Sequence, residues 1–278
     1  MIRLLVDSAS DCSMEELKKK NIEQVSLAIT LDNKEYKGGI ELTGDSFYIL
    51  MKNSGDFPKT SQPSPLDFLD IFTDVKEKGD SMICILLASK LSGTYQSANL
   101  AKSMVDYDDI YIIDSQSATY PIKVMVDYAD KLRQDGKSAK EIVAAVESLK
   151  GRVHVVAAVD TLEYLCRGGR LNRATAAVGE LANLKPIITL SKEGSVSVIG
   201  KCLGRMKALS YLVKYLQDRT LDPDFPLYTL YTYGTENCEK MEEKMKKENY
   251  HIDSRLQVGC TIGAHVGPGA FGIIFVEK

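Results

Sequence analysis

The chain has 278 residues, of which 44% are hydrophobic and 26% charged, and its formal net charge is −3. This composition is ordinary for a globular protein, and the length allows two domains. The slightly negative charge argues against a nucleic acid partner, and no apolar run approaches the ~20 residues of a membrane span. We therefore expect a soluble, cytoplasmic protein with no transmembrane segment, although transient contact with a membrane surface stays open.

Cysteine spacing excludes two further classes of site. The six cysteines are scattered along the chain and form no C-x-x-C pair. Neither a zinc site nor a disulfide framework is indicated by such spacing. There is also no G-x-x-x-x-G-K-[ST] loop for nucleotide phosphates and no H-E-x-x-H motif. The sequence thus predicts no metal site, no cofactor and no means of holding ATP.

The first half of the chain alternates between strand and helix patterns. Buried or half-buried strands are predicted at residues 2–6, 25–31, 82–88 and 110–114. Amphipathic helices are predicted at 14–20, 45–51, 66–78, 94–105, 123–134 and 139–149. This alternation predicts an α/β domain with a Rossmann-like parallel sheet over residues 1–159, in which a strand at 153–159 is the last element.

A different order follows. A helix at 162–181, interrupted by Gly168-Gly169, precedes short strands and further helices, and this arrangement is typical of an α+β domain. The strands are expected at 187–190, 196–200, 227–233 and 273–276, and the helices at 205–219 and 236–248. We therefore expect a second domain over residues 160–278, with a ligand between the two domains. Whether the segment 60–76 packs with this second domain stays open.

One loop of the first domain has the setting of a binding site. Leu91-Ser92-Gly93-Thr94 connects a predicted buried strand to a helix, at the edge where open α/β sheets bind ligands. The free N–H groups of a helix N-terminus favour an anion, and Gly93 lets the backbone approach a ligand closely. Ser92 is therefore a candidate binding residue, with a simple capping or turn role as the alternative.

Two other stretches bring further polar groups. Three prolines within residues 58–65 forbid a helix or an internal strand, so a shaped loop is predicted that exposes the hydroxyls of Thr60, Ser61 and Ser64. Near the C-terminus, His265 lies among glycines that match G-x-G-x-x-G. A dinucleotide site is rejected, because an apolar strand rather than a helix follows these glycines. We expect the glycines to bring His265 against a ligand or the other domain.

A serine hydrolase is the alternative that these residues leave open. Ser92 would be its nucleophile, His265 its base, and Asp7 or Asp114 the group that orients the histidine. The surroundings of Ser92 read Lys90-Leu91-Ser92-Gly93-Thr94 and lack the G-x-S-x-G signature of the nucleophile elbow.

Several motifs in the same order resemble the DegV family of bacterial fatty-acid-binding proteins over the whole chain. They are Thr60-Ser61-Gln62-Pro63-Ser64, Leu91-Ser92-Gly93-Thr94-Tyr95-Gln96-Ser97-Ala98, Leu162-Glu163-Tyr164-Leu165, Gly168-Gly169-Arg170 and Ile262-Gly263-Ala264-His265-Val266-Gly267-Pro268-Gly269-Ala270. The resemblance implies two domains with one long-chain fatty acid between them. It also implies that Thr60 and Ser92 bind the carboxylate, with His265 beside it and Ser61, Gly93, Thr94 and Gly267 in supporting loops.

The resemblance further implies a non-catalytic carrier, the binding subunit of a bacterial fatty acid kinase. A separate ATP-binding kinase subunit would phosphorylate the bound carboxylate for phospholipid synthesis. Basic residues of the second domain, Arg170, Arg173 and Arg205, are candidates for docking this partner. One departure from the family pattern is Tyr120-Pro121, where a glycine pair is common, and we expect Tyr120 to narrow or reshape the acyl tunnel.

Overall fold

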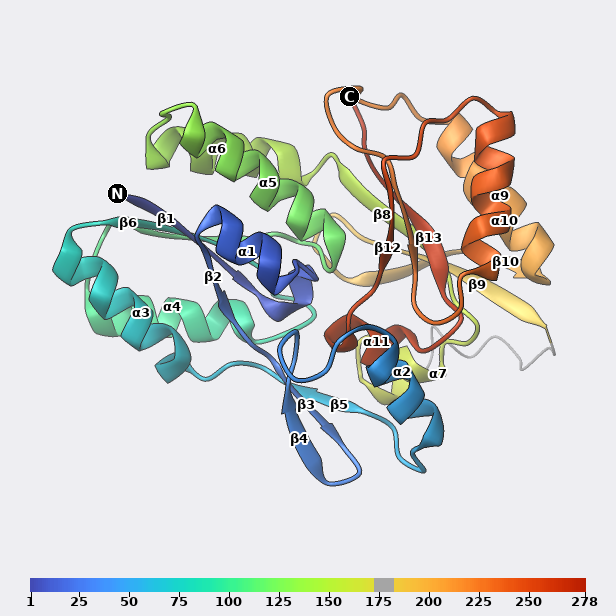
Figure 1. The fold of residues 1–278 in the computed structure, drawn as a ribbon, viewed down its shortest axis with the longest axis horizontal. Coiled ribbons are helices and arrows are strands. Elements are labelled where there is room, and N and C mark those ends of the chain that lie inside the picture. Colours follow the sequence, from blue (N-terminus) through green and yellow to red (C-terminus); the bar gives the residue numbers. More distant parts are fainter. Residues whose placement is uncertain (173–182) are drawn as a thin grey trace.

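The protein, described here as a computed structural model over residues 1–172 and 183–278, contains two large sheets that lie side by side (Figure 1). The first sheet is parallel, with the strand order β2-β1-β6-β7. Its strands are β1 (Ile2–Asp7), β2 (Ile22–Val25), β6 (Ser81–Leu86) and β7 (Ile110–Asp114). The near-continuous apolar runs of β1 and β6 fit this position, because the central strands of a parallel sheet are buried on both faces.

Helices cover both faces of the first sheet. On one face, α3 (Pro65–Lys78) and α4 (Thr94–Val105) pack against side chains that include Leu5 and Cys84. On the other face, α1 (Met14–Lys20), α5 (Tyr120–Gln134) and α6 (Ala139–Lys150) pack against side chains that include Leu4 and Ile83. Successive residues of a strand point to opposite faces, so one continuous apolar run supplies both cores.

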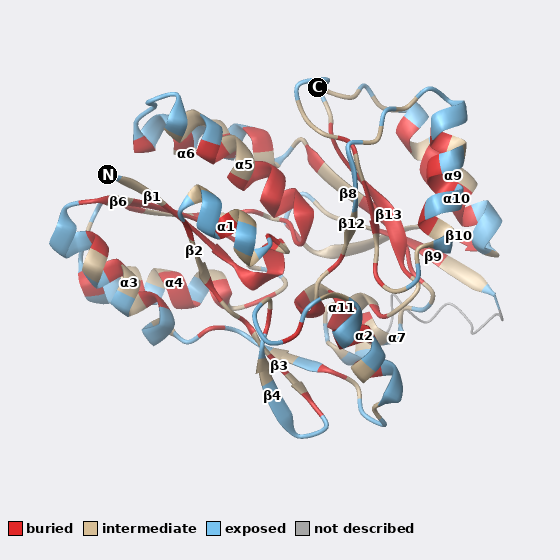
Figure 2. Ribbon diagram, in the orientation of Figure 1, coloured by how far each residue is buried: buried red, intermediate tan, exposed pale blue. Residues whose placement is uncertain are grey.

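The second sheet is mixed and has the strand order β10-β9-β8-β13-β11-β12. Its strands are β8 (Val153–Ala158), β9 (Leu184–Leu190), β10 (Val196–Leu203), β11 (Tyr228–Tyr231), β12 (Ser254–Gln257) and β13 (Phe271–Val276). One face packs against α9 (Arg205–Gln217) and α10 (Glu236–Lys247). Side chains of the other face belong to the same apolar cluster as α5 and α6, so the two sheets share a core (Figure 2).

A third, small sheet lies next to both (Figure 1). It has the order β4-β3-β5, from β3 (Ala28–Leu31), β4 (Lys34–Lys37) and β5 (Lys59–Ser61). Together with α2 (Gly44–Asn53) it packs on α11 (Cys260–Val266), which in turn contacts α7 (Glu163–Arg167). A short 3-10 helix, η1 (Ser8–Ser10), follows β1. Elements distant in sequence thus meet around α11.

The predicted fold class is confirmed: a parallel α/β unit is followed by a second, sheet-rich unit. Strand β8 differs from the prediction, because it pairs with β9 and β13 in the second sheet although it lies within residues 1–159. An apolar strand pattern does not say which sheet the strand joins. The domain boundary at residue 159 stays a prediction, and a division by sheets falls between α6 and β8.

Other differences concern individual elements. The predicted strand at 25–31 is divided between β2, which pairs with β1, and β3, which pairs with β4 and β5. Of the segment 60–76, β5 contacts α11, whereas α3 packs on α4 and the first sheet. Of the helix predicted at 162–181, the structure forms α7, which ends at Arg167. Residues 173–181 lie outside the described residues. Within the described parts of the chain, no helix is long and apolar enough to cross a membrane.

Candidate functional site

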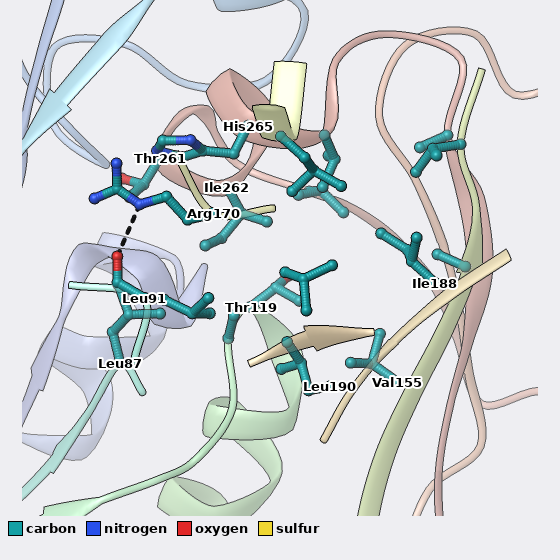
Figure 3. A pocket seen from close by; sticks show the side chains of 18 of the residues that line it. Leu87, Leu91, Thr119, Val155, Arg170, Ile188, Leu190, Thr261, Ile262 and His265 are labelled. Atoms are coloured by element: carbon teal, nitrogen blue, oxygen red, sulfur yellow. Dashed lines mark hydrogen bonds between the residues drawn. The ribbon is translucent and has the colours of Figure 1, made fainter. Parts of the chain in front are cut away.

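A cavity is lined by strands of the second and third sheets and by segments that follow the strands of the first sheet (Figure 3). The first unit supplies Leu87 and Leu91, and the second sheet supplies Val155, Ile188 and Leu190. Most of the other lining side chains are also aliphatic. A wall of this kind suits a long apolar ligand, since burying such a ligand removes it from water without leaving polar groups unpaired.

Polar side chains gather at one end of the cavity. Thr60 of β5, Ser92 of the loop before α4, and Thr261 and His265 of α11 line this end, as does Arg170 after α7. Thr60, Ser92 and His265, the three residues predicted to bind a carboxylate, therefore lie around one cavity. Thr261 was not predicted, although its position four residues before His265 in a helix places both side chains on one face.

Thr60 and His265 are in direct contact. The distance from Thr60 Oγ1 to His265 Nε2 is 2.8 Å, within hydrogen-bonding range, although 205 positions separate the residues. The ring of His265 fits because residue 168 is a glycine: a Cβ there would lie 2.2 Å from His265 Nδ1. His265 is on the short helix α11, which the sequence analysis did not predict, and Gly267 follows at the C-cap.

The protonation state of His265 follows from its surroundings. Burial, and to a lesser degree the charge of Arg170, lowers the pKa of His265 to about 4. The imidazole is therefore neutral at pH 7. Its Nδ1 atom is buried and has no hydrogen-bond partner among the described residues. An unpaired acceptor is less costly than an unpaired N–H, so we place the proton on Nε2, where it donates to Thr60 Oγ1. The Thr60 hydroxyl then remains free to donate to a ligand.

This low pKa predicts a loss of stability in acid. Because the pKa of His265 is about 6.5 in an unfolded chain and about 4 in the folded protein, the unfolded state binds the proton more readily. The contribution of neutral His265 to the free energy of unfolding is fully present above pH 6.5. It falls by about 3 kcal/mol as the pH drops toward 4. Urea unfolding at pH 7.5, 5.5 and 4 should therefore show wild type losing stability relative to His265→Gln. Parallel pH profiles for the two proteins would contradict a depressed pKa.

Ser92 is held at the start of α4. Its hydroxyl oxygen lies 2.8 Å from Thr94 Oγ1 and accepts a hydrogen bond from the Thr94 N–H at 3.3 Å. A Cβ at residue 93 would lie 1.9 Å from the Gln62 side-chain oxygen, so any larger residue there would have to displace the exposed Gln62 side chain. Ser92 thus has both a local capping contact and a place in the cavity wall, so the two interpretations of this residue are compatible.

Arg170, which the sequence analysis names as a candidate docking residue, lines the cavity. Its docking role stays a prediction, and its place at the cavity was not indicated by the sequence. Its Nε donates to the Leu91 carbonyl at 2.9 Å (Figure 3), and another guanidinium nitrogen donates to the Gly168 carbonyl. Burial lowers the pKa of Arg170, but the group has no acidic partner in a salt bridge among the described residues. A positive charge therefore borders the polar end of the cavity, where it favours an anion.

The other predicted residues are placed as follows. Arg205 is exposed and lies 3.3 Å from Asp160, and Arg173 lies outside the described residues. Docking by these arginines stays a prediction. Of the supporting residues, Thr94 is buried, whereas Ser61 is exposed and pairs with β3. Gly267 has a φ of +73°, and a Cβ there would lie 2.4 Å from the Tyr164 ring.

The geometry does not support the serine hydrolase. The His265 Nε2 atom forms a hydrogen bond with the Thr60 hydroxyl, and the Ser92 hydroxyl forms one with the Thr94 hydroxyl. Asp7 accepts from the N–H groups of Ala9 and Leu87, and Asp114 accepts from Ser89 and Gln116, so neither carboxylate orients the histidine. A catalytic triad requires a hydrogen bond from the serine to the histidine and another from the histidine to the aspartate, and neither is formed by these residues.

Tyr120 does not narrow the cavity as expected. It is absent from the residues that line the cavity, and its hydroxyl donates to the Gln257 carbonyl at 2.6 Å. Tyr120 therefore links α5 to β12. Among the described residues, no group of three or more His, Cys, Asp or Glu side chains is placed to hold a metal ion.

Comparison with known proteins agrees with these observations. The family model described as "Uncharacterised protein, DegV family" matches residues 1–278. A DegV domain-containing protein of Caldanaerobacter subterraneus subsp. tengcongensis is 36% identical over 279 residues, which cover 100% of this chain and 99% of the relative.

Solved structures are similar over the same length. A DegV family protein of Thermus thermophilus, described as fatty acid binding, is 30% identical with a TM-score of 0.88, covering 100% of this chain and 99% of the other. A stearic acid-binding protein of Eubacterium ventriosum is 27% identical with a TM-score of 0.87 and the same coverage. The match of the family model to the whole length, together with these relatives, means that the chain belongs to the DegV family.

Proposed function

We propose that this protein binds one long-chain fatty acid, with its carboxylate at the polar end of the cavity and its acyl chain along the aliphatic wall. The observation that carries the proposal is the distribution of polar groups: Thr60, Ser92, Thr261, Arg170 and His265 gather at one end. The hydroxyls of the other polar lining residues, Thr119, Thr189 and Thr232, are hydrogen-bonded within the protein. A ligand with a single anionic head and a long apolar tail matches this distribution. The fatty acid binding named for the Thermus and Eubacterium relatives supports the same ligand class.

The head group is bound by several hydrogen-bond donors. The Thr60 hydroxyl, polarised by the His265 N–H, and the Ser92 hydroxyl are both placed to donate to a carboxylate. Arg170 adds a positive charge beside them without pairing with a protein carboxylate among the described residues. The cost of desolvating the fatty acid carboxylate is thereby offset.

The tail supplies most of the binding free energy. Burial of an acyl chain of ~16 carbons contributes ~0.8 kcal/mol per CH₂, or ~12 kcal/mol before the cost of ordering the chain. Such a ligand would remain bound through purification. Native mass spectrometry of the purified protein, followed by denaturation and identification of the released molecule, tests this directly. A stoichiometric long-chain fatty acid is expected. A protein that is empty and also takes up no added fatty acid would overturn the proposal.

We further infer that the bound carboxylate is presented to a separate, ATP-dependent kinase subunit, so that the protein acts as a carrier. The absence of nucleotide motifs from the sequence supports an external source of phosphate. Arg205 at the start of α9 is exposed and therefore accessible to a partner. With such a kinase and ATP, Arg205→Glu is expected to slow acyl phosphate formation without loss of bound fatty acid. Lys214→Glu, on the exposed side of the same helix, is the control. Equal rates for both variants would contradict docking through Arg205.

A further inference from the structure

Val155 and Leu190 lie at the end of the cavity away from His265 and Arg170 (Figure 3). Thr189, the residue before Leu190 in β9, also lines the cavity. Thr189 is the only one of the three with a polar side chain, and its hydroxyl donates to the Val155 carbonyl at 2.8 Å. This end therefore offers no unpaired side-chain donor from these residues. If the proposed function holds, the methyl end of the fatty acid lies here.

A second cavity lies directly behind this wall. It opens between α6, β8 and β9, and its lining includes polar or charged side chains such as Gln116, Lys150 and Lys192. Val155, Thr189 and Leu190 line both cavities. Leu190 and Val155 are only half-buried, as expected for residues that border the apolar cavity as well as the second cavity. A single layer of residues thus separates the apolar cavity from a polar groove.

The turn that follows β9 holds this wall in place. Within it, the Ser191 N–H donates to the Ser195 carbonyl at 2.8 Å and the Gly194 N–H donates to the Ser191 carbonyl at 2.9 Å. Gly194 is buried and has a φ of +84°, and a Cβ there would lie 2.8 Å from the Ala88 Cβ and 3.0 Å from the Gln116 Cα. The turn is therefore packed closely against the first unit. Leu190, one residue before it, has little freedom to move away from a longer ligand.

We propose that Leu190 is the end stop of the cavity and sets the longest acyl chain that the protein binds. It is the largest of the three shared side chains and, unlike Thr189, makes no hydrogen bond through its side chain. Truncation of Leu190 removes three carbons from the wall and joins the cavity to the groove. A longer chain then has room to pass. A larger residue at the same position shortens the cavity.

Competition among saturated fatty acids tests this role. The full-length protein is offered an equimolar mixture of C14 to C24 acids, and the bound acids are extracted and quantified. Relative to wild type, Leu190→Ala is expected to favour acids two carbons longer by roughly tenfold, since each added CH₂ is buried only when the wall is open. Leu190→Phe is expected to favour shorter acids. Val196→Ala is the matched control, because Val196 pairs with Leu190 in register and lines the cavity but not the groove.

The outcomes separate the end stop from the proposed function. A chain-length profile that is unchanged in Leu190→Ala and Leu190→Phe, while fatty acid is still bound, overturns the end stop alone. An equal shift in Leu190→Ala and Val196→Ala also overturns it, because cavity volume rather than the wall would then set the length. Failure of wild type to bind any acid of the series overturns the proposed function and the end stop together.

Discussion

Thr60→Ala/Ser92→Ala is expected to lose its fatty acid during purification and to bind added fatty acid at least about 100-fold more weakly than wild type. Each hydroxyl is placed to donate a hydrogen bond to the carboxylate, and a hydrogen bond to a charged group contributes about 1.5–3 kcal/mol. Removal of both leaves a carboxylate that is desolvated but poorly paired. Native mass spectrometry and a fluorescent fatty acid titration measure the two effects.

Conservative variants separate loss of the hydroxyls from loss of structure. Thr60→Ser retains a hydroxyl for both His265 and the ligand, so it is expected to bind within a few-fold of wild type. The double alanine variant should still unfold cooperatively, because Thr60 is only half-buried and Ser92 lies in a loop. Undiminished affinity in a folded double variant would mean that the carboxylate is bound elsewhere. Arg170 and Thr261 would then be the residues to replace next.

Gly168→Ala is expected to destabilise the protein by about 1–3 kcal/mol and to weaken fatty acid binding by roughly tenfold. The added Cβ would lie 2.2 Å from His265 Nδ1 and 2.8 Å from its Cε1, so the buried ring must move. Movement of the ring breaks the contact between His265 and Thr60. Urea unfolding and fatty acid titration measure the two losses.

Gly151→Ala is the matched control. Gly168 and Gly151 are both helix C-caps with nearly equal angles, φ −73° and ψ −9° against φ −71° and ψ −10°. A Cβ at Gly151 has no atom within 4 Å, so alanine there is expected to be neutral or slightly stabilising. The clash is thereby separated from the backbone effect of alanine.

A double-mutant cycle identifies the partner in the clash. In Gly168→Ala/His265→Ala the added methyl group has space, so the combined loss of stability should be smaller than the sum of the single losses. Additive losses would show that the ring of His265 is not what the methyl group displaces.

Local patterns were sufficient for the outline of the first unit. The apolar runs at β1 and β6 and the helices between them predict a parallel sheet, because only strands buried on both faces carry such runs. The capping boxes at Ser13 and Ser138 mark helix starts that depend on residues only three positions apart. Signals of this kind are contained in the sequence itself.

Helix α11 illustrates where local patterns fail. Gly263 lies inside this helix and lowers its helix propensity, and no helix was predicted here from the sequence. Tertiary packing requires the glycine within the helix, since a Cβ at Gly263 would lie 2.4 Å from the Tyr48 hydroxyl oxygen. The Tyr48 hydroxyl in turn donates to the Val258 carbonyl at 2.6 Å. Packing of this helix against α2 therefore outweighs its low propensity.

By itself, the sequence determined the α/β class, the family motifs and the hydroxyl and imidazole groups of the candidate site, because each depends on residue types at short spacings. Only the tertiary structure decided that β8 joins the second sheet, that Thr60 meets His265 across 205 positions, and that Arg170 borders the cavity. These contacts depend on how one sheet packs against another. The periodicity of a single strand or helix predicts which of its faces is buried, but not which other element packs against that face.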